Sequence, residues 1–260
     1  MKKGIYLTTI TIITIVCIIG GSIVHFGNLF SDLPFQFLNS QIIRTDDTSS
    51  TTKETSSENL QGFDHIIADV YVSDIIIKHD KDYSIAYEAT KTLIPKWAVK
   101  SSTLTIRQAT KHKKKWGTQN QNCKITITIP EDATLSTINL DSSVGDIRLD
   151  SIIADSLTTD TSVGDTEIKN CNIASIETDG DVGDIDITNC SFTDLDSDNS
   201  VGNINVSSAK DLSDYDIDLD TSIGDVYVND RSCKREFSQD GDSDGSVTLD
   251  NSTGDISLSY

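Results

Sequence analysis

The stretch Asp141-Ser142-Ser143-Val144-Gly145-Asp146-Ile147 decides the fold, because five close copies of it follow later in the chain. These copies are DTSVGDT from Asp160, DGDVGDI from Asp179, DNSVGNI from Asp198, DTSIGDV from Asp220 and DNSTGDI from Asp250. The central glycines, at 145, 164, 183, 202, 224 and 254, are separated by 19, 19, 19, 22 and 30 residues. A period near 20 built from β-forming residues is typical of a solenoid in which each repeat makes one coil. The sequence therefore predicts an all-β fold, a β-solenoid of about six coils over residues 135–260.

Four positions of the repeat are apolar in nearly every copy, and we expect them to face the interior and stack from coil to coil. They lie seven residues before the glycine (Ile138, Leu157, Ile176, Leu195, Ile217, Val247), one before (Val144, Val163, Val182, Val201, Ile223, Thr253), two after (Ile147, Thr166, Ile185, Ile204, Val226, Ile256) and four after (Leu149, Ile168, Ile187, Val206, Val228, Leu258). The apolar positions one before and two after the glycine are three residues apart, which breaks the alternation of inward and outward residues. The chain must therefore bend at the glycine, which can adopt a positive φ without strain.

Two columns of acidic residues follow from the same register, and we expect both to face solvent. The first lies four residues before each glycine (Asp141, Asp160, Asp179, Asp198, Asp220, Asp250), and the second lies one after (Asp146, Asp165, Asp184, Asn203, Asp225, Asp255). Like charges about 4.8 Å apart repel by roughly 0.9 kcal/mol in bulk water. Two kinds of interaction could offset this repulsion. Each first-column aspartate accepts a hydrogen bond from the backbone N–H two residues on, or divalent cations bridge neighbouring coils.

One loop strengthens the calcium interpretation. The longest spacing contains Asp240-Gly241-Asp242-Ser243-Asp244-Gly245, which matches the D-x-D-x-D-G start of a calcium loop. Asp240, Asp242 and Asp244 are therefore candidate Ca²⁺ ligands. However, Asn251 replaces the bidentate glutamate at the twelfth position, and the flanking residues predict strands. The alternative is an acidic surface loop without a metal.

Four cysteines in a large domain do not indicate a disulfide scaffold. No C-x-x-C occurs, so a zinc cluster is not expected either. Cys171 and Cys190 are 19 residues apart and share one column of the repeat with Ile152 and Ala209. We expect them to stack as free, buried thiols. A disulfide between adjacent coils is the alternative, and it would be strained.

The N-terminus predicts a membrane anchor within residues 1–30. Lys2 and Lys3 precede an uncharged run over 5–24, whose 20 residues would span roughly 30 Å as a helix, about the thickness of a bilayer core. The basic residues before the run predict that the N-terminus lies on the inner side of the cell membrane and the C-terminal domain on the outer side. A cleaved signal peptide is the alternative. Residues 31–60 are rich in Ser and Thr and predict a flexible stalk, and 61–134 predict a β-rich lead-in or cap before the coils.

The net charge of the chain limits the classes of partner that it can bind. The net charge is -20, and residues 118–260 carry 7 Lys/Arg against 30 Asp/Glu, which excludes nucleic acid as a ligand. The basic stretch Lys111–Trp116 predicts either a solvated hairpin tip or a contact with an anionic polymer or headgroup. No histidine lies in 135–260 and no catalytic motif occurs, so we expect no enzyme. A carbohydrate-active β-helix enzyme, using outward aspartates, remains the less favoured alternative.

The order of these features resembles a known family. The stretch KITITIPEDATLSTINLDSSVGDIRL, followed by repeated S-V-G-D-I units, is similar to the bacterial “putative adhesin” family of cell-envelope proteins, which includes LiaG-like and YvlB-like proteins. The likeness covers roughly 60–260. It implies a membrane-anchored extracellular β-solenoid linked to envelope stress. The rigid repeats with an acidic face and no catalytic motif indicate a non-enzymatic adhesion or interaction module, whose partner is a cell-wall polymer or another surface protein. The resemblance implies no catalytic residues.

Overall fold

Short alternating strands make up the described part of the chain. The computed structural model describes residues 53–108 and 122–260, all within one compact unit, Ser40–Tyr260. The strands in chain order are β1 (Lys53–Asn59), β2 (His65–Val72), β3 (Asp74–His79), β4 (Ser84–Thr90), β5 (Pro95–Lys100), β6 (Thr103–Gln108), β7 (Cys123–Ile129), β8 (Leu135–Val144), β9 (Ile147–Asp150), β10 (Ile153–Val163), β11 (Thr166–Lys169), β12 (Asn172–Val182), β13 (Ile185–Cys190), β14 (Asp194–Val201), β15 (Ile204–Ser208), β16 (Asp216–Ile223), β17 (Val226–Val228), β18 (Arg231–Lys234), β19 (Glu236–Gln239), β20 (Ser246–Thr253) and β21 (Ile256–Ser259). In these residues there is no helix long and apolar enough to cross a membrane.

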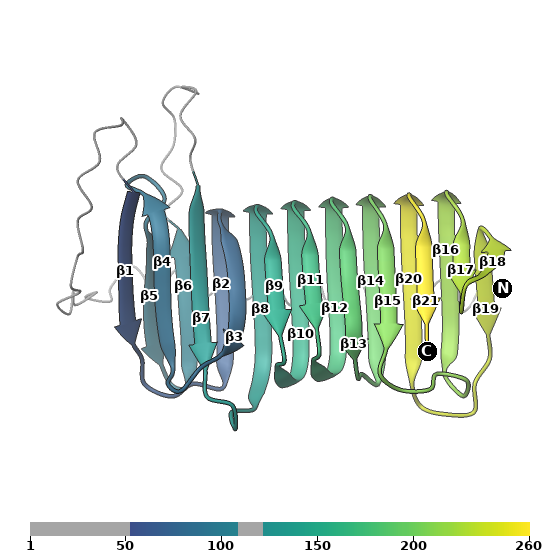
Figure 1. Ribbon diagram of the computed structural model, residues 1–260, viewed down its shortest axis with the longest axis horizontal. Helices are drawn as coiled ribbons and strands as arrows, with labels where there is room; N and C mark the ends of the chain where they lie inside the picture. The colour runs from purple at the N-terminus through teal and green to yellow at the C-terminus, as the bar shows by residue number, and fades with distance from the viewer. Residues whose placement is uncertain (1–52, 109–121) are drawn as a thin grey trace. The chain divides into compact units, whose positions relative to one another are not determined.

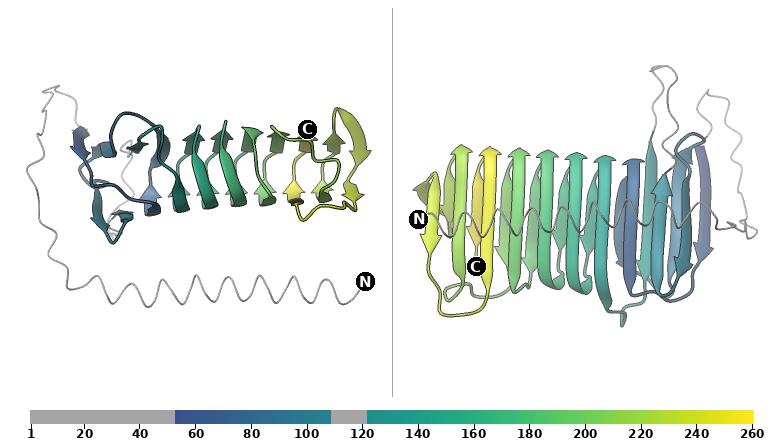
Figure 2. Two further views of the ribbon diagram at one scale, coloured as in Figure 1. Left: turned by 90° about the horizontal axis from the view of Figure 1, so that it is seen from below. Right: turned by 180° about the vertical axis from the view of Figure 1, so that it is seen from behind.

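The strands form two sheets that face each other (Figures 1 and 2). One sheet has the order β1-β4-β7-β3-β9-β11-β13-β15-β21-β17-β18, and the other has the order β19-β16-β20-β14-β12-β10-β8-β2-β6-β5. Each repeat gives a strand to one sheet, bends at its glycine, and gives a shorter strand to the other. We call such a pair of strands a rung. Neighbouring rungs pair in parallel and in register, for example Asp160 with Asp179. The predicted β-solenoid is therefore confirmed.

Within the described residues the stack contains eight rungs, two more than the six glycine-centred copies predict. The additional rungs are β6–β7 and β2–β3, which lie in the segment predicted as a lead-in. β2 pairs in parallel with β8, and β3 pairs with β9. The turn between β2 and β3 has Ser73 at the place of the glycine, so the motif does not reveal this rung.

The last two glycine-centred rungs do not follow chain order. β20 lies between β14 and β16, and β21 lies between β15 and β17. The rung made latest in the sequence is thus inserted between two earlier ones (Figure 1). The irregular spacings between the last glycines agree with this change of rung order. A seven-residue linker, 209–215, joins β15 to β16 across the inserted rung, whereas only two residues join β9 to β10.

The interior differs from the sequence prediction at one column. The residues seven before, two after and four after each glycine are buried, as expected. The column one residue before the glycine was predicted to face inward, and this is wrong: Val144, Val163, Val182, Val201 and Ile223 are 41–64% exposed. The interior next to the corner is filled instead by the residues three before and two after the glycine. The last strand residue therefore lies at the rim.

Substitutions in two neighbouring columns test this assignment. We expect Val182→Ala to change the free energy of unfolding by less than about 0.5 kcal/mol, because an exposed side chain loses little burial. Ile187→Ala in the same rung should cost about 2–4 kcal/mol, since it leaves a cavity in the core. Urea denaturation of both variants measures the difference, and similar losses would contradict the exposed position of the valine column.

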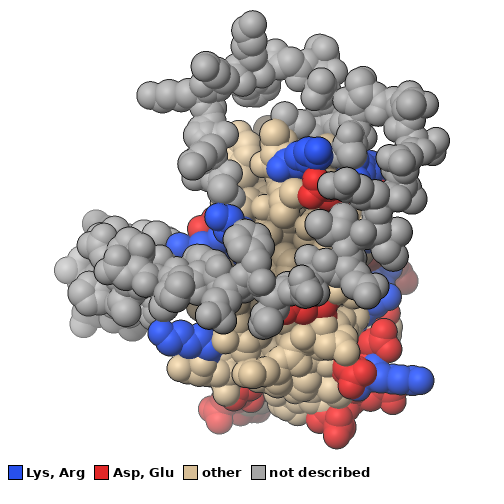
Figure 3. All heavy atoms as spheres, turned by 90° about the vertical axis from the view of Figure 1, so that its left-hand side faces the viewer, with Lys and Arg blue, Asp and Glu red and all other residues tan. Residues whose placement is uncertain are grey.

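Antiparallel strands cover both ends of the stack. β4 and β1 extend the sheet beyond β7, and β5 pairs with β6. At the other end β19 pairs with β16, and β18 pairs with β17. Figure 3 shows Lys and Arg beside Asp and Glu at the end formed by β1 and β5. Charged edge strands oppose pairing with other chains. β1 also corrects the predicted stalk 31–60, because Lys53–Asn59 are a strand of the sheet.

Several predicted segments lie outside the described residues. These are the anchor, 1–30, with its apolar run over 5–24, the stalk residues 31–52, and the basic stretch Lys111–Trp116. That stretch falls between β6 and β7, the two strands of one rung.

Candidate functional site: a row of aspartates on the outer face

The corner of each of the six glycine-centred rungs requires glycine for two reasons. Gly183 has a φ of +148°, in the region that residues with a side chain rarely adopt. A Cβ on Gly183 would also lie 2.0 Å from the carbonyl oxygen of Gly164 in the rung before it. The corners therefore stack backbone on backbone, which fixes the register of everything that the rungs carry.

The second acidic column holds these corners together. The Asp146 carboxylate accepts the backbone N–H of Asp165 at 3.0 Å, Asp165 accepts that of Asp184 at 2.9 Å, and Asp184 accepts that of Asn203 at 2.7 Å. The ladder continues through Asn203 to Asp255 and from Asp255 to Asp225, at 3.0 and 2.9 Å. An amide oxygen does the same work as a carboxylate at Asn203. This column is therefore structural.

A buried polar column, not predicted from the sequence, also supports the corners. It lies three residues before the glycine in five of the six copies, and Gly180 stands there in the sixth. Ser142, Asn199, Asn251 and Thr221 donate a side-chain hydrogen bond to the carbonyl at the corner of the preceding rung, with distances of 2.7–3.3 Å. The signal was a polar residue at a position that period-two alternation turns inward.

The second column gives a test that separates hydrogen bonding from charge. Asp165→Ala should lower the free energy of unfolding by about 1–2 kcal/mol, because the N–H of Asp184 loses its acceptor. Asp165→Asn should be tolerated, since Asn203 serves natively at the equivalent place. Thermal and urea unfolding measure both. An equal loss in the two variants would mean that charge, not the accepted hydrogen bond, matters here.

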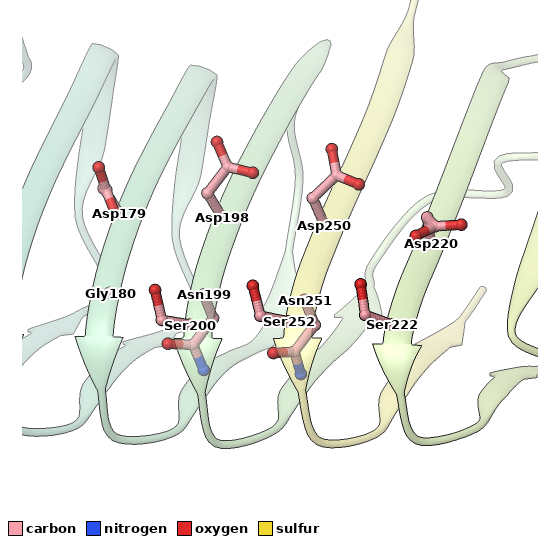
Figure 4. Close-up of a pocket in the computed structure, with 10 residues that line it drawn as sticks. All are labelled: Asp179, Gly180, Asp198, Asn199, Ser200, Asp220, Ser222, Asp250, Asn251 and Ser252. Atoms are coloured by element: carbon pink, nitrogen blue, oxygen red, sulfur yellow. The ribbon is translucent and has the colours of Figure 1, made fainter.

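The first acidic column forms a continuous row across the outer face of one sheet. Its members are paired rung to rung in the order Asp69, Asp141, Asp160, Asp179, Asp198, Asp250, Asp220. Asp69 joins from the β2–β3 rung. The row meets Arg107 in register at one end and Glu236 at the other. Figure 4 shows four of these carboxylates side by side on consecutive strands. We call these seven residues the aspartate row.

The aspartate row lacks the hydrogen bonds that the sequence suggested. Asx turns to the N–H two residues on were one interpretation, but within the described chain no such bond is made by the six aspartates that precede the glycines. Partial burial, together with Asp160 and Asp69, raises the pKa of Asp141 to about 6. Partial burial and the neighbouring acids Asp196 and Asp250 likewise raise the pKa of Asp198 to about 6.

The cause is the same along the row. Burial first, and then a neighbouring carboxylate, raise the pKa of Asp160, Asp179 and Asp250 above the ordinary value. The row next to it contributes Glu177 and Asp196, whose pKa values are also raised by burial. The face therefore stores unfavourable like-charge energy at neutral pH, which protons, cations or a positively charged partner would relieve.

Serines line one side of the aspartate row. Ser200, Ser252 and Ser222 lie two residues after Asp198, Asp250 and Asp220, and Figure 4 shows them as a second line beside the carboxylates. Together they border a shallow, open hollow of about 200 Å³. The hollow is polar, runs along consecutive strands, and repeats the same groups at each step. It suits an extended ligand better than a compact one.

The predicted calcium loop lies in the connection between β19 and β20. Asp242 and Asp244 are exposed, and the backbone of the loop is held by other groups: Gly241 N–H donates to Asp216 Oδ1 at 2.7 Å, and Ser243 N–H donates to the Asp214 carbonyl at 2.9 Å. Across residues 53–108 and 122–260, no three acidic, His or Cys side chains are brought into a metal-holding group. The structure does not bring Asp240, Asp242 and Asp244 together. Calcium binding by these residues stays a prediction.

The two stacked cysteines lie in the core. Cys171 and Cys190 are buried and unbridged. Backbone N–H groups of Ile152 and Cys171 point at their sulfurs, at 3.3 and 3.4 Å. This is the stacked arrangement of free thiols predicted from the spacing of 19.

Comparison with known proteins agrees with the geometry. A “putative cell adhesion protein” from Clostridium sporogenes is similar in structure, with a TM-score of 0.51 and 15% sequence identity over 80% of this chain and 99% of that chain. A “putative adhesin” from Bacteroides fragilis has a TM-score of 0.44 and 17% identity, over 80% of this chain and 98% of that chain. At such identities only the fold of the first is informative. Among curated proteins, none matches this chain.

A family model settles the relationship that the motifs suggested. The model described as Toastrack DUF4097 matches residues 63–260, from just before β2 to the last described residue. These residues hold all eight rungs and the whole aspartate row. The resemblance drawn from the repeated S-V-G-D-I units is thereby confirmed, and the chain belongs to the Toastrack DUF4097 family.

Proposed function

We propose that this protein is a non-enzymatic interaction module of the cell surface, anchored in the membrane through residues 5–24. In this proposal the rungs form a rigid support outside the cell, and the aspartate row is the contact surface. Its partner carries positive charge in an extended arrangement. An amine-bearing wall polymer or a basic segment of another surface protein would fit.

The observation that carries this proposal is the row itself. Seven carboxylates lie in register on the outer face of one sheet, and a positively charged partner would relieve their mutual repulsion. An acid–base pair for catalysis would need two carboxylates with distinct environments. Here each aspartate repeats the environment of the one before it. The name of the similar structure from Clostridium sporogenes, a “putative cell adhesion protein”, is in line with the same class of function.

The experiment compares two triple variants of equal charge. Asp160→Asn/Asp179→Asn/Asp198→Asn changes the aspartate row, and Asp146→Asn/Asp165→Asn/Asp184→Asn changes the second column while keeping its hydrogen-bonding oxygens. The full chain in lipid nanodiscs is tested for binding to amine-bearing wall polymer and for crosslinking to surface proteins in cells. We expect only the first variant to lose binding. Equal loss in both, or no binding by the unaltered protein, would contradict the proposal.

A calcium-stabilised rod is a second candidate, favoured by the raised carboxyl pKa values along the row. Calcium would then replace the positive partner between rungs. The thermal midpoint of the full chain is compared in calcium and in chelator. A rise that survives Asp242→Ala/Asp244→Ala assigns calcium to the aspartate row, and a rise lost in that variant assigns it to the loop. An unchanged midpoint removes this candidate.

A further inference from the structure

The inserted rung, residues Ser246–Ser259, has a place in the stack that chain order does not provide. Its long strand pairs with β14 on one side and β16 on the other, and its short strand pairs with β15 and β17. Both neighbouring rungs precede it in the sequence. They must leave a slot one rung wide until this segment arrives.

The slot is built to fit this segment on both of its edges. Val247, Leu249, Ile256 and Leu258 are fully buried in it. Asn251 Nδ2 donates to the Gly202 carbonyl at 2.7 Å on one side, and Thr221 Oγ1 donates to the Gly254 carbonyl at 2.9 Å on the other. The corner asparagine–aspartate ladder also passes through it, from Asn203 to Asp255 and on to Asp225.

An empty slot would expose four strand edges, two in each sheet, and an open core. Unpaired edges of this kind bind extended segments by strand addition. A segment with the same sequence would make every one of these bonds, whichever molecule carries it. This is the condition for exchange of an identical element between copies of a protein.

The connection of the rung also favours its release over that of its neighbours. Its connection to β19 is an acidic loop, with Asp242 and Asp244 exposed. The neighbouring rung β14–β15, in contrast, is joined to β13 by a short turn.

We propose that residues Ser246–Ser259 are an exchangeable rung, which a second copy of the chain can insert into the slot between β14–β15 and β16–β17. The interaction surface is the pair of rung edges that face the slot. The partner is the same segment of another molecule. Such exchange would link neighbouring surface rods without any other contact.

The test uses exposed serines that lie next to each other across the slot. Ser200, Ser252 and Ser222 stand at equivalent outward positions of the three consecutive rungs (Figure 4). One full-length chain carries Ser252→Cys, and a second carries Ser200→Cys or Ser222→Cys, all with Cys17→Ser and Cys233→Ser. The two chains are mixed at high concentration in detergent, incubated and oxidised. A disulfide between them requires that the segment of one chain occupies the slot of the other.

The control pairs Ser252→Cys with Asp181→Cys, an exposed residue in the same outward row but two rungs from the inserted one. Even after exchange these Cα atoms stay about 10 Å apart, beyond the roughly 7 Å that a disulfide can bridge. We expect about tenfold more covalent dimer from both test pairs than from the control. A single chain with Ser200→Cys/Ser252→Cys, oxidised beforehand, should no longer exchange. Equal dimer in test and control pairs, or dimer from only one test pair, would overturn the proposal.

Discussion

Replacing Gly183 by alanine is expected to lower the free energy of unfolding by about 2–6 kcal/mol, enough to unfold many domains of this size. Two costs combine. The positive φ of +148° strains any residue with a side chain, by about 1–3 kcal/mol. The added Cβ also meets the carbonyl oxygen of Gly164 at 2.0 Å, and this oxygen belongs to backbone held in both sheets. The overlap can be relieved only by moving the rungs apart, at a further cost of about 1–3 kcal/mol.

Gly62→Ala is the matched control. The nearest atom to a Cβ there is in the Tyr83 ring at 3.5 Å, an ordinary contact, and Gly62 has no positive φ. Its free energy of unfolding should stay within about 0.5 kcal/mol of the unaltered protein. Urea denaturation followed by circular dichroism measures both variants. A Gly183→Ala protein as stable as Gly62→Ala would mean that the corners do not stack as described.

The second large effect is on pH dependence, and its sign is unusual for an acidic protein. The pKa of Asp141 and of Asp198 is raised to about 6 in the folded state, from 3.8. The folded protein therefore binds protons that the unfolded chain has released. Stability from this source is complete below about pH 4 and is lost as the pH rises through about 6. Each rise in pKa, from 3.8 to about 6, corresponds to roughly 3 kcal/mol, but both side chains are exposed, and solvent screening leaves about 1 kcal/mol each.

Asp198→Asn isolates this effect. At pH 8 we expect the variant to be about 1 kcal/mol more stable than the unaltered protein, because the amide removes one charge from the row. Below about pH 3.5 the two curves should meet, since the native carboxyl is then largely protonated in both the folded and the unfolded chain. Asp141→Asn should behave alike, and the two gains should add because the sites are three rungs apart. A variant less stable than the native protein at pH 8 would show that Asp198 has a favourable partner.

Much of the fold could be predicted from the glycine-centred copies. Their fixed spacing implies one coil per copy, and apolar residues at Ile138 and Ile147 identify the two inward faces. The order of the last two rungs could not be predicted in the same way, although the irregular glycine spacings of 22 and 30 residues result from it. A copy matches equally well with any other copy, so repetition fixes register and leaves neighbours undetermined. The β2–β3 rung was missed because Ser73 replaces the glycine.

The rim valines show where periodic reasoning fails. Val182 is apolar in a column of apolar residues, and this pattern alone predicts burial. Alternation places Gly180 inward and Asp181 outward, and so places Val182 inward. The bend at Gly183 ends that alternation, and the space beside Gly180 is taken by Asn199 of the next rung and by Ile185.

The candidate site was predicted in part. Both acidic columns lie on the surface, as their positions in the repeat required. Their roles are reversed: the second column, at Asp165 and its equivalents, makes the hydrogen bonds, and the aspartate row makes none of them. Sequence position alone cannot show this, because the acceptor at Asp165 bonds to a residue in the next rung rather than to its own turn.

The stacking order of the rungs is the claim on which the corners, the aspartate row and the exchangeable rung all depend. Spin labels at Ser143 and at either Ser252 or Ser222 measure it directly by pulsed electron resonance, in chains with Cys17→Ser and Cys233→Ser. With rungs about 4.8 Å apart, the first pair is expected at a Cα separation of about 19 Å and the second at about 24 Å. Thus the residue later in the sequence lies nearer. A longer distance to Ser252 than to Ser222 would contradict the account.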